Sequence, residues 1–174
     1  MCIRLYKLSF AMTHTIRPAT TDDAAAICDI YNPYIRDTFI SFETEPVTPE
    51  QIKHRILDIT ASFPWLVCAE NEQILGYAYA TKWRTRAAYQ HAVETSVYLS
   101  PEAAGKGLGS ALYRALIAEL QKLPVHVVIG GIALPNAASI ALHEKMGYEK
   151  VAHFAQVGKK FDRWIDVGYW QRVL

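Results

Sequence analysis

The sequence contains few cysteines. There are three, Cys2, Cys28 and Cys68, and they are odd in number and widely separated. Such a set makes no disulfide framework, and its spacing matches no pattern of metal ligands. We therefore expect no bound metal and a reducing compartment, which indicates a cytoplasmic protein.

The sequence also lacks an excess of charge and any long apolar run. Its 18 Lys and Arg residues nearly balance 17 Asp and Glu residues, so the formal net charge is +1. This balance indicates no polyanionic partner such as a nucleic acid. No apolar run approaches the ~20 residues that a membrane-spanning helix requires, so we expect no membrane partner.

Repeats, linkers and low-complexity tracts are lacking as well. The first eleven residues have neither the apolar centre nor the small-residue cleavage site of a signal peptide. The ordered pattern begins near Thr13. We therefore expect residues 1–12 to form a flexible N-terminal extension and residues 13–174 to form a single domain.

What the sequence does contain is a succession of strand and helix patterns. Strands are predicted over residues 15–17, 65–70, 74–82, 93–99, 125–130, 148–156 and 164–173. Helices are predicted over residues 22–36, 49–61, 108–122 and 136–146, and Pro33 should break or kink the first of them. The fold class is α+β (mixed α/β): a central, mostly antiparallel twisted sheet of about six to seven strands, flanked by about four helices.

Three alternate glycines, Gly105, Gly107 and Gly109, open the third predicted helix. Glycines let an anion approach the backbone closely, and the first N–H groups of a helix have no partner within the helix. This turn is therefore a candidate pyrophosphate cradle, with Lys106 adding positive charge; a plain tight turn is the alternative. Gly107 directly after Lys106 excludes a Walker A loop, and Ser110 in place of a third spaced glycine makes a dinucleotide fingerprint a poor fit.

Two motifs together resemble the GNAT acyltransferase superfamily. The glycine turn is similar to the family's R/Q-x-x-G-x-G/A, with Ala104 where the family has Arg or Gln. The run N-A-A-S-I-A-L-H-E-K-M-G-Y at residues 136–148 is similar to the second family motif, with His143 where most members have Tyr. Further runs, among them F-x-x-E-P-x-T-P at residues 42–49, narrow the resemblance to the phosphinothricin and methionine sulfone (sulfoximine) N-acetyltransferases.

This resemblance implies a GNAT-like fold, acetyl-CoA as co-substrate and direct acetyl transfer to the amine of a small amino-acid-like acceptor. We also expect a homodimer. Asn136 suits an amide of pantetheine, and equally the N-cap of its own helix. The expected acetyl-CoA site comprises strand backbone, the glycine turn and this amide: Val97, Tyr98, Leu99, Gly105, Lys106, Gly107, Leu108, Gly109, Ser110 and Asn136.

Glu94 and His143 are the candidate catalytic residues, because the amine must lose a proton and the leaving thiolate must gain one. Glu94 should face the side of its strand opposite Val93 and Thr95. Apolar neighbours should raise the pKa of Glu94, which suits a base; a solvent-facing carboxylate is the alternative. His143 stands where the family places a tyrosine near the sulfur and would act as acid or base; a packed core histidine is the alternative.

The acceptor site is the least determined by sequence. Arg84 and Arg86 precede the central strand and are candidate partners for a carboxylate, because arginine binds carboxylates bidentately; a solvated basic loop is the alternative. By resemblance alone, Phe39, Tyr89 and Lys160 are further candidates for the wall of this site.

Other functions stay open at this stage. The acceptor could instead be a polyamine, an aminoglycoside or a protein terminus, although a cationic acceptor would favour an acidic pocket. A non-catalytic acetyl-CoA-binding module is a hypothesis of another class. The presence of both Glu94 and His143 favours an enzyme over such a module.

Overall fold

The computed structural model describes residues 14–174, and the predicted extension over residues 1–12 lies outside the described residues. Seven strands form one sheet: β1 (Thr15–Pro18), β2 (Trp65–Glu70), β3 (Gln73–Lys82), β4 (Ala92–Leu99), β5 (Val127–Leu134), β6 (Glu149–Lys160) and β7 (Arg163–Val173). The α-helices of this part of the chain are α1 (Ala24–Asp37), α2 (Pro49–Thr60), α3 (Leu108–Leu120) and α4 (Ala137–Lys145). The predicted α+β fold is confirmed.

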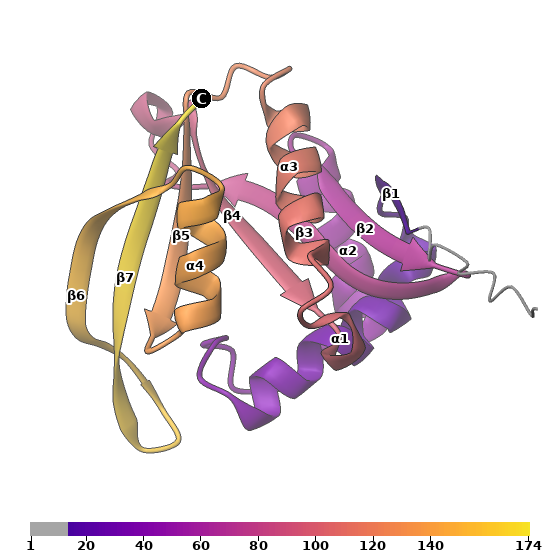
Figure 1. Cartoon of the computed structure of the whole chain (residues 1–174), viewed down its shortest axis with the longest axis horizontal. Helices are drawn as coiled ribbons and strands as arrows, with labels where there is room; N and C mark the ends of the chain where they lie inside the picture. The colour runs from indigo at the N-terminus through magenta and orange to yellow at the C-terminus, as the bar shows by residue number, and fades with distance from the viewer. Residues whose placement is uncertain (1–13) are drawn as a thin grey trace, which may run out of the picture.

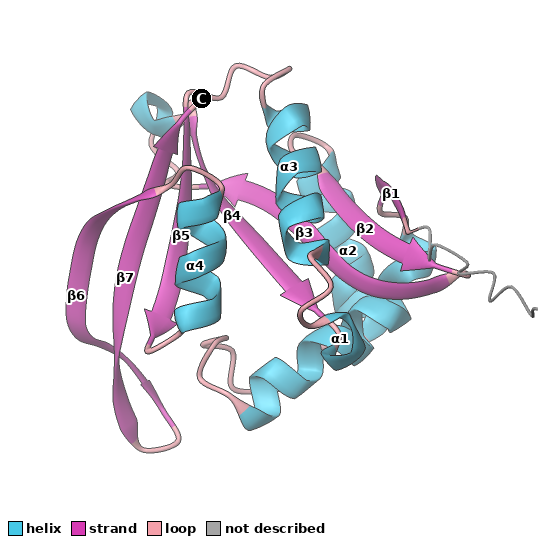
Figure 2. Ribbon diagram, viewed as in Figure 1, coloured by secondary structure: helices cyan, strands magenta, loops and turns pink. Residues whose placement is uncertain are grey.

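The sheet has the strand order β1-β2-β3-β4-β5-β7-β6. Every neighbouring pair is antiparallel except β4 and β5, which run parallel. Helices α3 and α4 cover one face of the sheet, and α1 and α2 cover the other (Figure 1, Figure 2). Each face holds its own apolar core, so the sheet is buried on both sides.

Helix α1 runs through Pro33 without interruption, so the predicted break there is wrong. Proline donates no N–H and crowds the preceding turn, which usually ends a helix. Here the buried stripe that holds Ile27 and Tyr31 continues past the proline to Ile35. Packing of this stripe against the sheet therefore keeps the last turn helical.

Two helix ends follow the predicted chemistry. Thr48 Oγ1 accepts a hydrogen bond from the Gln51 backbone N–H at 3.2 Å, and Gln51 Oε1 accepts one from the Thr48 N–H at 2.8 Å. This reciprocal pair is a capping box at the start of α2. Helix α4 ends before Gly147, whose φ of +82° suits glycine.

Strand β5 extends beyond the range that its pattern predicted. It covers Val127–Leu134, whereas the prediction placed this strand over residues 125–130. Pairing with β7 continues the strand to Leu134, which lies opposite Asp166. Strand β6 is longer than predicted for the same reason, since its pairing with β7 resumes after a bulge and continues to Lys160.

Within residues 14–174, no helix has both the length and the apolar character that a membrane crossing demands.

Candidate active site

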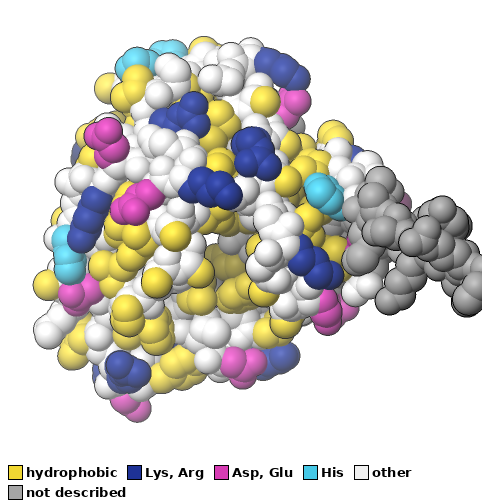
Figure 3. Space-filling view, viewed as in Figure 1, with side chains coloured by type: hydrophobic (Ala, Val, Ile, Leu, Met, Phe, Trp, Pro, Cys, Tyr) yellow, Lys and Arg dark blue, Asp and Glu magenta, His cyan; other side chains and the backbone are white. Residues whose placement is uncertain are grey.

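The parallel strands β4 and β5 separate in the middle of the sheet. They pair only where Ala92–Glu94 lies beside Val127–Ile129. Beyond that point β4 stays on β3 as far as Leu99, and β5 stays on β7. The two strands diverge in Figure 1, and the space-filling view is hollowed between α3 and α4 at the same place (Figure 3). Residues Thr95–Leu99 therefore have a neighbouring strand, β3, on one edge alone, and the backbone groups of their other edge face an opening. The Leu99 carbonyl oxygen accepts a hydrogen bond from the Tyr34 hydroxyl at 2.7 Å.

Glu94 lies where this opening begins, on the sheet face that α1 and α2 cover. The alternation predicted for this strand is confirmed, since Tyr98 on the same face packs against Tyr31 and Tyr34, with ring centroids at 4.8 and 5.2 Å. Burial raises the pKa of the Glu94 carboxyl, and the positive charge of Arg84 opposes that shift. A half-buried carboxylate of this kind suits proton transfer near neutral pH.

His143 approaches from the opposite face, on α4, and is buried. Its Nδ1 lies 2.7 Å from the Ser139 carbonyl oxygen, which can only accept, so Nδ1 carries the proton of the neutral ring. Nε2 then accepts a hydrogen bond from the Tyr113 hydroxyl at 2.9 Å. Burial lowers the pKa of His143, while the hydrogen bond to Ser139 opposes the shift. The resting imidazole is therefore neutral and of one tautomer.

Two successive glycines of β5 let these side chains approach the sheet from both sides. A Cβ on Gly130 would overlap the His143 ring. A Cβ on Gly131 would lie 3.0 Å from Glu94 Oε1 and 3.2 Å from the Tyr169 ring. Only glycine leaves room for both contacts, so the glycine pair places an acid–base group on each face of the same point of the sheet.

Two cavities meet at this point. The one beside Glu94 has a volume of about 380 Å³, and its wall is mixed. The polar part includes the charged side chains of Glu94 and Lys159, and the apolar part is made by Ile40, Phe42, Val157, Val167 and Tyr169. A smaller one, of about 50 Å³, lies along the open edge of β4 and reaches Asn136, Ser139 and His143. Both are lined by Ile40, Gly131 and Ala133. A molecule in one cavity can therefore contact a molecule in the other.

The glycine turn lies at the far end of the open β4 edge. Gly105 and Gly107 have φ of +75° and +77°, and no atom lies within 4 Å of the point where a Cβ would project from either. Gly107 is the N-cap of α3, so the first N–H groups of that helix border this open space. The turn thus has the shape and the partial positive charge that a pyrophosphate requires.

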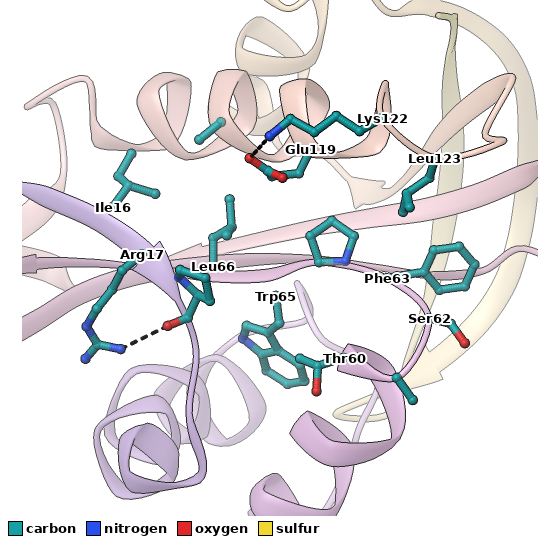
Figure 4. A pocket seen from close by; sticks show the side chains of 14 residues that line it. Ile16, Arg17, Thr60, Ser62, Phe63, Trp65, Leu66, Glu119, Lys122 and Leu123 are labelled. Atoms are coloured by element: carbon teal, nitrogen blue, oxygen red, sulfur yellow. Dashed lines mark hydrogen bonds and ion pairs between the residues drawn. The ribbon is translucent and has the colours of Figure 1, made fainter.

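A larger cavity, of about 700 Å³, lies elsewhere, between the end of α3 and strands β1 and β2 (Figure 4). Its wall is mostly apolar, and the charged side chains of Glu119 and Lys122 on its rim pair with each other at 2.7 Å. Neither Glu94 nor His143 lines it. We therefore assign the chemistry to the opening between β4 and β5.

Comparison with known proteins agrees with this geometry. A sequence model of the acetyltransferase (GNAT) domain matches residues 16–168. The chain belongs to the GNAT family of acetyltransferases.

Individual relatives place it more closely within that family. A phosphinothricin N-acetyltransferase from Streptomyces viridochromogenes is 41% identical over 157 residues, which are 90% of this chain and 86% of the relative. An L-methionine sulfoximine/L-methionine sulfone acetyltransferase from Salmonella typhimurium is 39% identical over 90% of this chain and 92% of the relative. This GNAT chain is thus an acetyl-CoA-dependent N-acetyltransferase related to both activities.

A solved relative carries acetyl-CoA. The structure of a phosphinothricin acetyltransferase from Sinorhizobium meliloti in complex with acetyl-CoA matches with a TM-score of 0.89 and 36% identity, covering 94% of this chain and 89% of that one. The co-substrate that the family resemblance implied is therefore present in a structural relative.

None of the five predicted acceptor residues lines the cavity beside Glu94. The Arg84 guanidinium lies 4.5 Å from the centre of the Trp83 ring, and that ring lies 5.3 Å from Tyr169, a wall residue. Arg86 and Tyr89 are exposed in the same loop. Phe39 is half-buried, with the Arg163 guanidinium 6.0 Å from its ring, and Lys160 is buried, its Nζ donating to the Ser41 carbonyl oxygen at 2.6 Å.

The predicted acetyl-CoA residues lie along one path. Val97, Tyr98 and Leu99 form the open edge of β4, and residues 105–110 form the turn and the first turn of α3. Asn136 caps α4, since its Oδ1 accepts from the Ser139 N–H at 3.1 Å, which leaves its amide NH₂ group to donate elsewhere. The predicted N-cap role of Asn136 is thereby confirmed, and its free amide NH₂ group is still compatible with a hydrogen bond to pantetheine.

Sequence reasoning missed several residues of the site. Tyr113 reads as one more apolar position of α3, and only the fold brings its hydroxyl to His143. The wall residues Ile40, Val157 and Tyr169 come from distant segments and carry no local signal. Gly130 and Gly131 did carry one, because adjacent glycines inside a strand indicate a close approach of other atoms to the backbone.

Proposed function

We propose that this enzyme transfers the acetyl group of acetyl-CoA to the primary amine of a small amino-acid-like acceptor of the phosphinothricin, methionine sulfone or methionine sulfoximine type. The observation that carries the proposal is the meeting of two cavities at Gly131, with Glu94 on one face of the sheet and His143 on the other. The activities of the two relatives described above, on phosphinothricin and on methionine sulfoximine and sulfone, support the acceptor class.

The residues of the β4–β5 opening fit acetyl-CoA. The open edge of β4 at Val97 and Leu99 offers backbone groups to the pantetheine amides, as a sheet edge does to an added strand. The turn at Gly105 and Gly107 holds the pyrophosphate, and Lys106 adds charge. When bound, acetyl-CoA supplies an acetyl group already activated as a thioester.

Glu94 is the base that takes a proton from the acceptor ammonium, directly or through one water. Its carboxylate borders the cavity of about 380 Å³, where the amine would lie. Its raised pKa, caused by burial, makes it a stronger base than an exposed carboxylate. Open backbone N–H groups of β4 next to it are placed to stabilise negative charge on the carbonyl oxygen.

Tyr113 and His143 form the acid side of the reaction. The Tyr113 hydroxyl holds a proton between the smaller cavity and His143 Nε2, at 2.9 Å from that nitrogen. When this proton passes to the thiolate sulfur, the Tyr113 phenolate regains one from His143 Nε2, which takes it up from solvent, while the Nδ1–H bond to the Ser139 carbonyl keeps the imidazole oriented. His143 thereby acts through Tyr113, which lies beside the open edge of β4.

The acceptor cavity combines charge and apolar surface in the way a zwitterion with an apolar side chain requires. Glu94 attracts the ammonium group. Arg84, whose charge acts on Glu94, and Arg86 are the partners for the carboxylate. Ile40, Phe42 and Val157 form the wall for the side chain.

Transfer is direct, without an acyl-enzyme. Cys28 and Cys68 are buried and line neither cavity, and burial raises the pKa of both thiols. A buried thiol of raised pKa is a poor nucleophile. Cys2 lies outside the described residues.

The catalytic domain spans residues 13–174 in this proposal, since the family match covers residues 16–168 and β7 extends to Val173. We also propose a homodimer, built on the exposed apolar side chains of β6 and β7: Val151, Phe154, Val157 and Trp164. A patch of this kind indicates an interface. Trp164→Glu should give a monomer by light scattering where the parent chain gives a dimer; a parent chain that is monomeric overturns this part.

The proposed activity is tested with a panel of acceptors and acetyl-CoA. We expect turnover of phosphinothricin, methionine sulfone and methionine sulfoximine, and much weaker turnover of spermidine, an aminoglycoside and a peptide with a free N-terminus. Turnover of spermidine above the amino acids would contradict the acceptor class. Binding of acetyl-CoA with no turnover of any amine would indicate a non-catalytic module.

A further inference from the structure

The run F-x-x-E-P-x-T-P begins at Phe42, in the loop of residues 38–47 that joins α1 to α2. Ile40 and Phe42 of this loop line the cavity beside Glu94. Ser41 and Glu43, which flank Phe42, make their hydrogen bonds on the other side, with Tyr31. One side of the loop therefore forms a wall of the cavity, and the other side is hydrogen-bonded to helix α1.

Side chains of α1 and α2 make the hydrogen bonds that fix this loop. The Tyr31 hydroxyl lies 2.7 Å from Ser41 Oγ and donates to Glu43 Oε1 at 2.9 Å. Arg55 of α2 donates to both oxygens of Glu43, at 2.7 and 2.9 Å. These hydrogen bonds hold the pKa of Glu43 below its ordinary value, so the carboxylate is charged. These hydrogen bonds fix the loop to the two helices. They do not determine the distance between the loop and the opposite wall of the cavity.

The opposite wall belongs to β6. Val157 and Gly158 of this strand line the cavity across from the loop. A Cβ on Gly158 would lie 2.6 Å from two atoms of the Phe42 ring, so the ring rests directly on the glycine backbone. The width of the cavity therefore depends on how closely the loop approaches β6.

Lys160 at the end of β6 makes the remaining contact. Its side chain is only 5% exposed, and its Nζ donates to the Ser41 carbonyl oxygen at 2.6 Å. Among the residues that the structure describes, this is the one hydrogen bond between the 38–47 loop and β6. Lysine is rarely buried to this extent unless its charge has partners, and here the Ser41 carbonyl and the nearby charge of Glu43 supply them.

We propose that Lys160 is a positioning residue that ties the 38–47 loop to β6 and thereby sets the width of the acceptor cavity. The proposal rests on the function proposed above, because it takes the cavity beside Glu94 as the acceptor site. It assigns Lys160 a role through Ser41 and Phe42. It does not assign Lys160 a direct contact with the acceptor carboxylate.

The test compares Lys160→Met, Lys160→Arg and the control Lys150→Met, an exposed lysine of the same strand. Two acceptors are used: methionine sulfone and the amine that lacks its carboxylate. We expect Lys160→Met to raise KM for both acceptors by about 10- to 100-fold, the range for losing one charged hydrogen bond. The kcat value and the affinity for acetyl-CoA should change little, and Lys160→Arg should recover part of the loss. Lys160→Gln, which keeps a shorter donor, replaces Lys160→Met in the comparison if that variant does not fold.

Three results would overturn the proposal. A loss confined to the acceptor with a carboxylate would mean that Lys160 binds the substrate directly. An unchanged KM would mean that the loop keeps its place without Lys160. An equal loss of kcat, KM and acetyl-CoA affinity would mean a general effect on the fold. Failure of the proposed function is seen separately, in a wild-type enzyme that acetylates neither acceptor.

Discussion

At the scale of single residues, we propose that the phosphates of the co-substrate bind at Gly107. Its φ is +77°, and the space in front of it is open. Gly107→Asp puts a carboxylate into that space, and we expect the affinity for acetyl-CoA to fall by about 100-fold or more, because charge repulsion replaces several charged hydrogen bonds. Calorimetry measures the affinity directly.

The matched control is Gly147→Asp. Gly147 also has a positive φ, +82°, and lies behind α4, where a Cβ would meet only the Arg172 side chain at 3.6 Å. It carries the same backbone strain without touching the turn, so acetyl-CoA affinity should be preserved. Equal losses in both variants would assign the effect to strain, and an unchanged Gly107→Asp would place the phosphates elsewhere.

In the proposed mechanism Arg84 acts in two ways, on the pKa of Glu94 and on the acceptor carboxylate, and Arg84→Ala separates them. Its charge lowers the pKa of Glu94, in opposition to burial. Because the base acts only when deprotonated, removing Arg84 should raise that pKa and move the acidic limb of kcat/KM to higher pH. Loss of the carboxylate partner should also raise KM about tenfold for an amino acid and less for a simple amine. An acidic limb at the same pH in Arg84→Ala would mean that Arg84 does not affect the pKa of Glu94.

Much of the site at this scale could be predicted from the sequence. Alternation along a strand places Glu94 opposite Thr95, and glycine spacing indicates the cradle, because both signals are local. The link from Tyr113 to His143 could not be predicted, since it joins α3 to α4 across the fold. The buried role of Lys160 could not be predicted either, because it depends on a loop more than a hundred residues away.

At the scale of elements, the capping box at the start of α2 offers a test of local stability. Thr48→Ala removes the oxygen that accepts from the Gln51 N–H. We expect the free energy of unfolding to fall by about 1 kcal/mol, within the usual range for an N-cap threonine. Urea denaturation measures it, and Thr44→Ala, at an exposed position of the preceding loop, is the control. An equal change in the free energy of unfolding in both variants would mean that the Thr48 cap does not stabilise the helix.

The elements that prediction misjudged were those in which packing overrides local preference. Pro33 predicts a break, but burial of Ile35 continues the helix. The predicted end of strand β5 at residue 130 is too early, because β7 provides a partner as far as Leu134. In both places a contact between distant segments continues the element beyond the end that its local sequence predicts.

At the scale of the whole molecule, the proposed active site depends on a sheet that is divided in its middle. The early separation of β4 and β5 opens a passage from one face to the other, and the glycines of β5 bring Glu94 and His143 to its two sides. Helices α3 and α4 then frame the side of the co-substrate, while the 38–47 loop and the β6–β7 hairpin frame the side of the acceptor. Neither half of the sheet forms the site alone.

In the proposed mechanism, acetyl transfer to an amine occurs at this passage with Glu94 as the base. The most direct measurement follows free CoA and N-acetylated methionine sulfone together in one reaction, for the parent enzyme, Glu94→Gln and the exposed control Glu149→Gln. We predict one acetylated amine for each CoA released, with kcat lowered about 10²–10⁴-fold in Glu94→Gln only. Release of CoA without acetylated amine, or a Glu94→Gln variant as fast as the parent enzyme, would contradict the account.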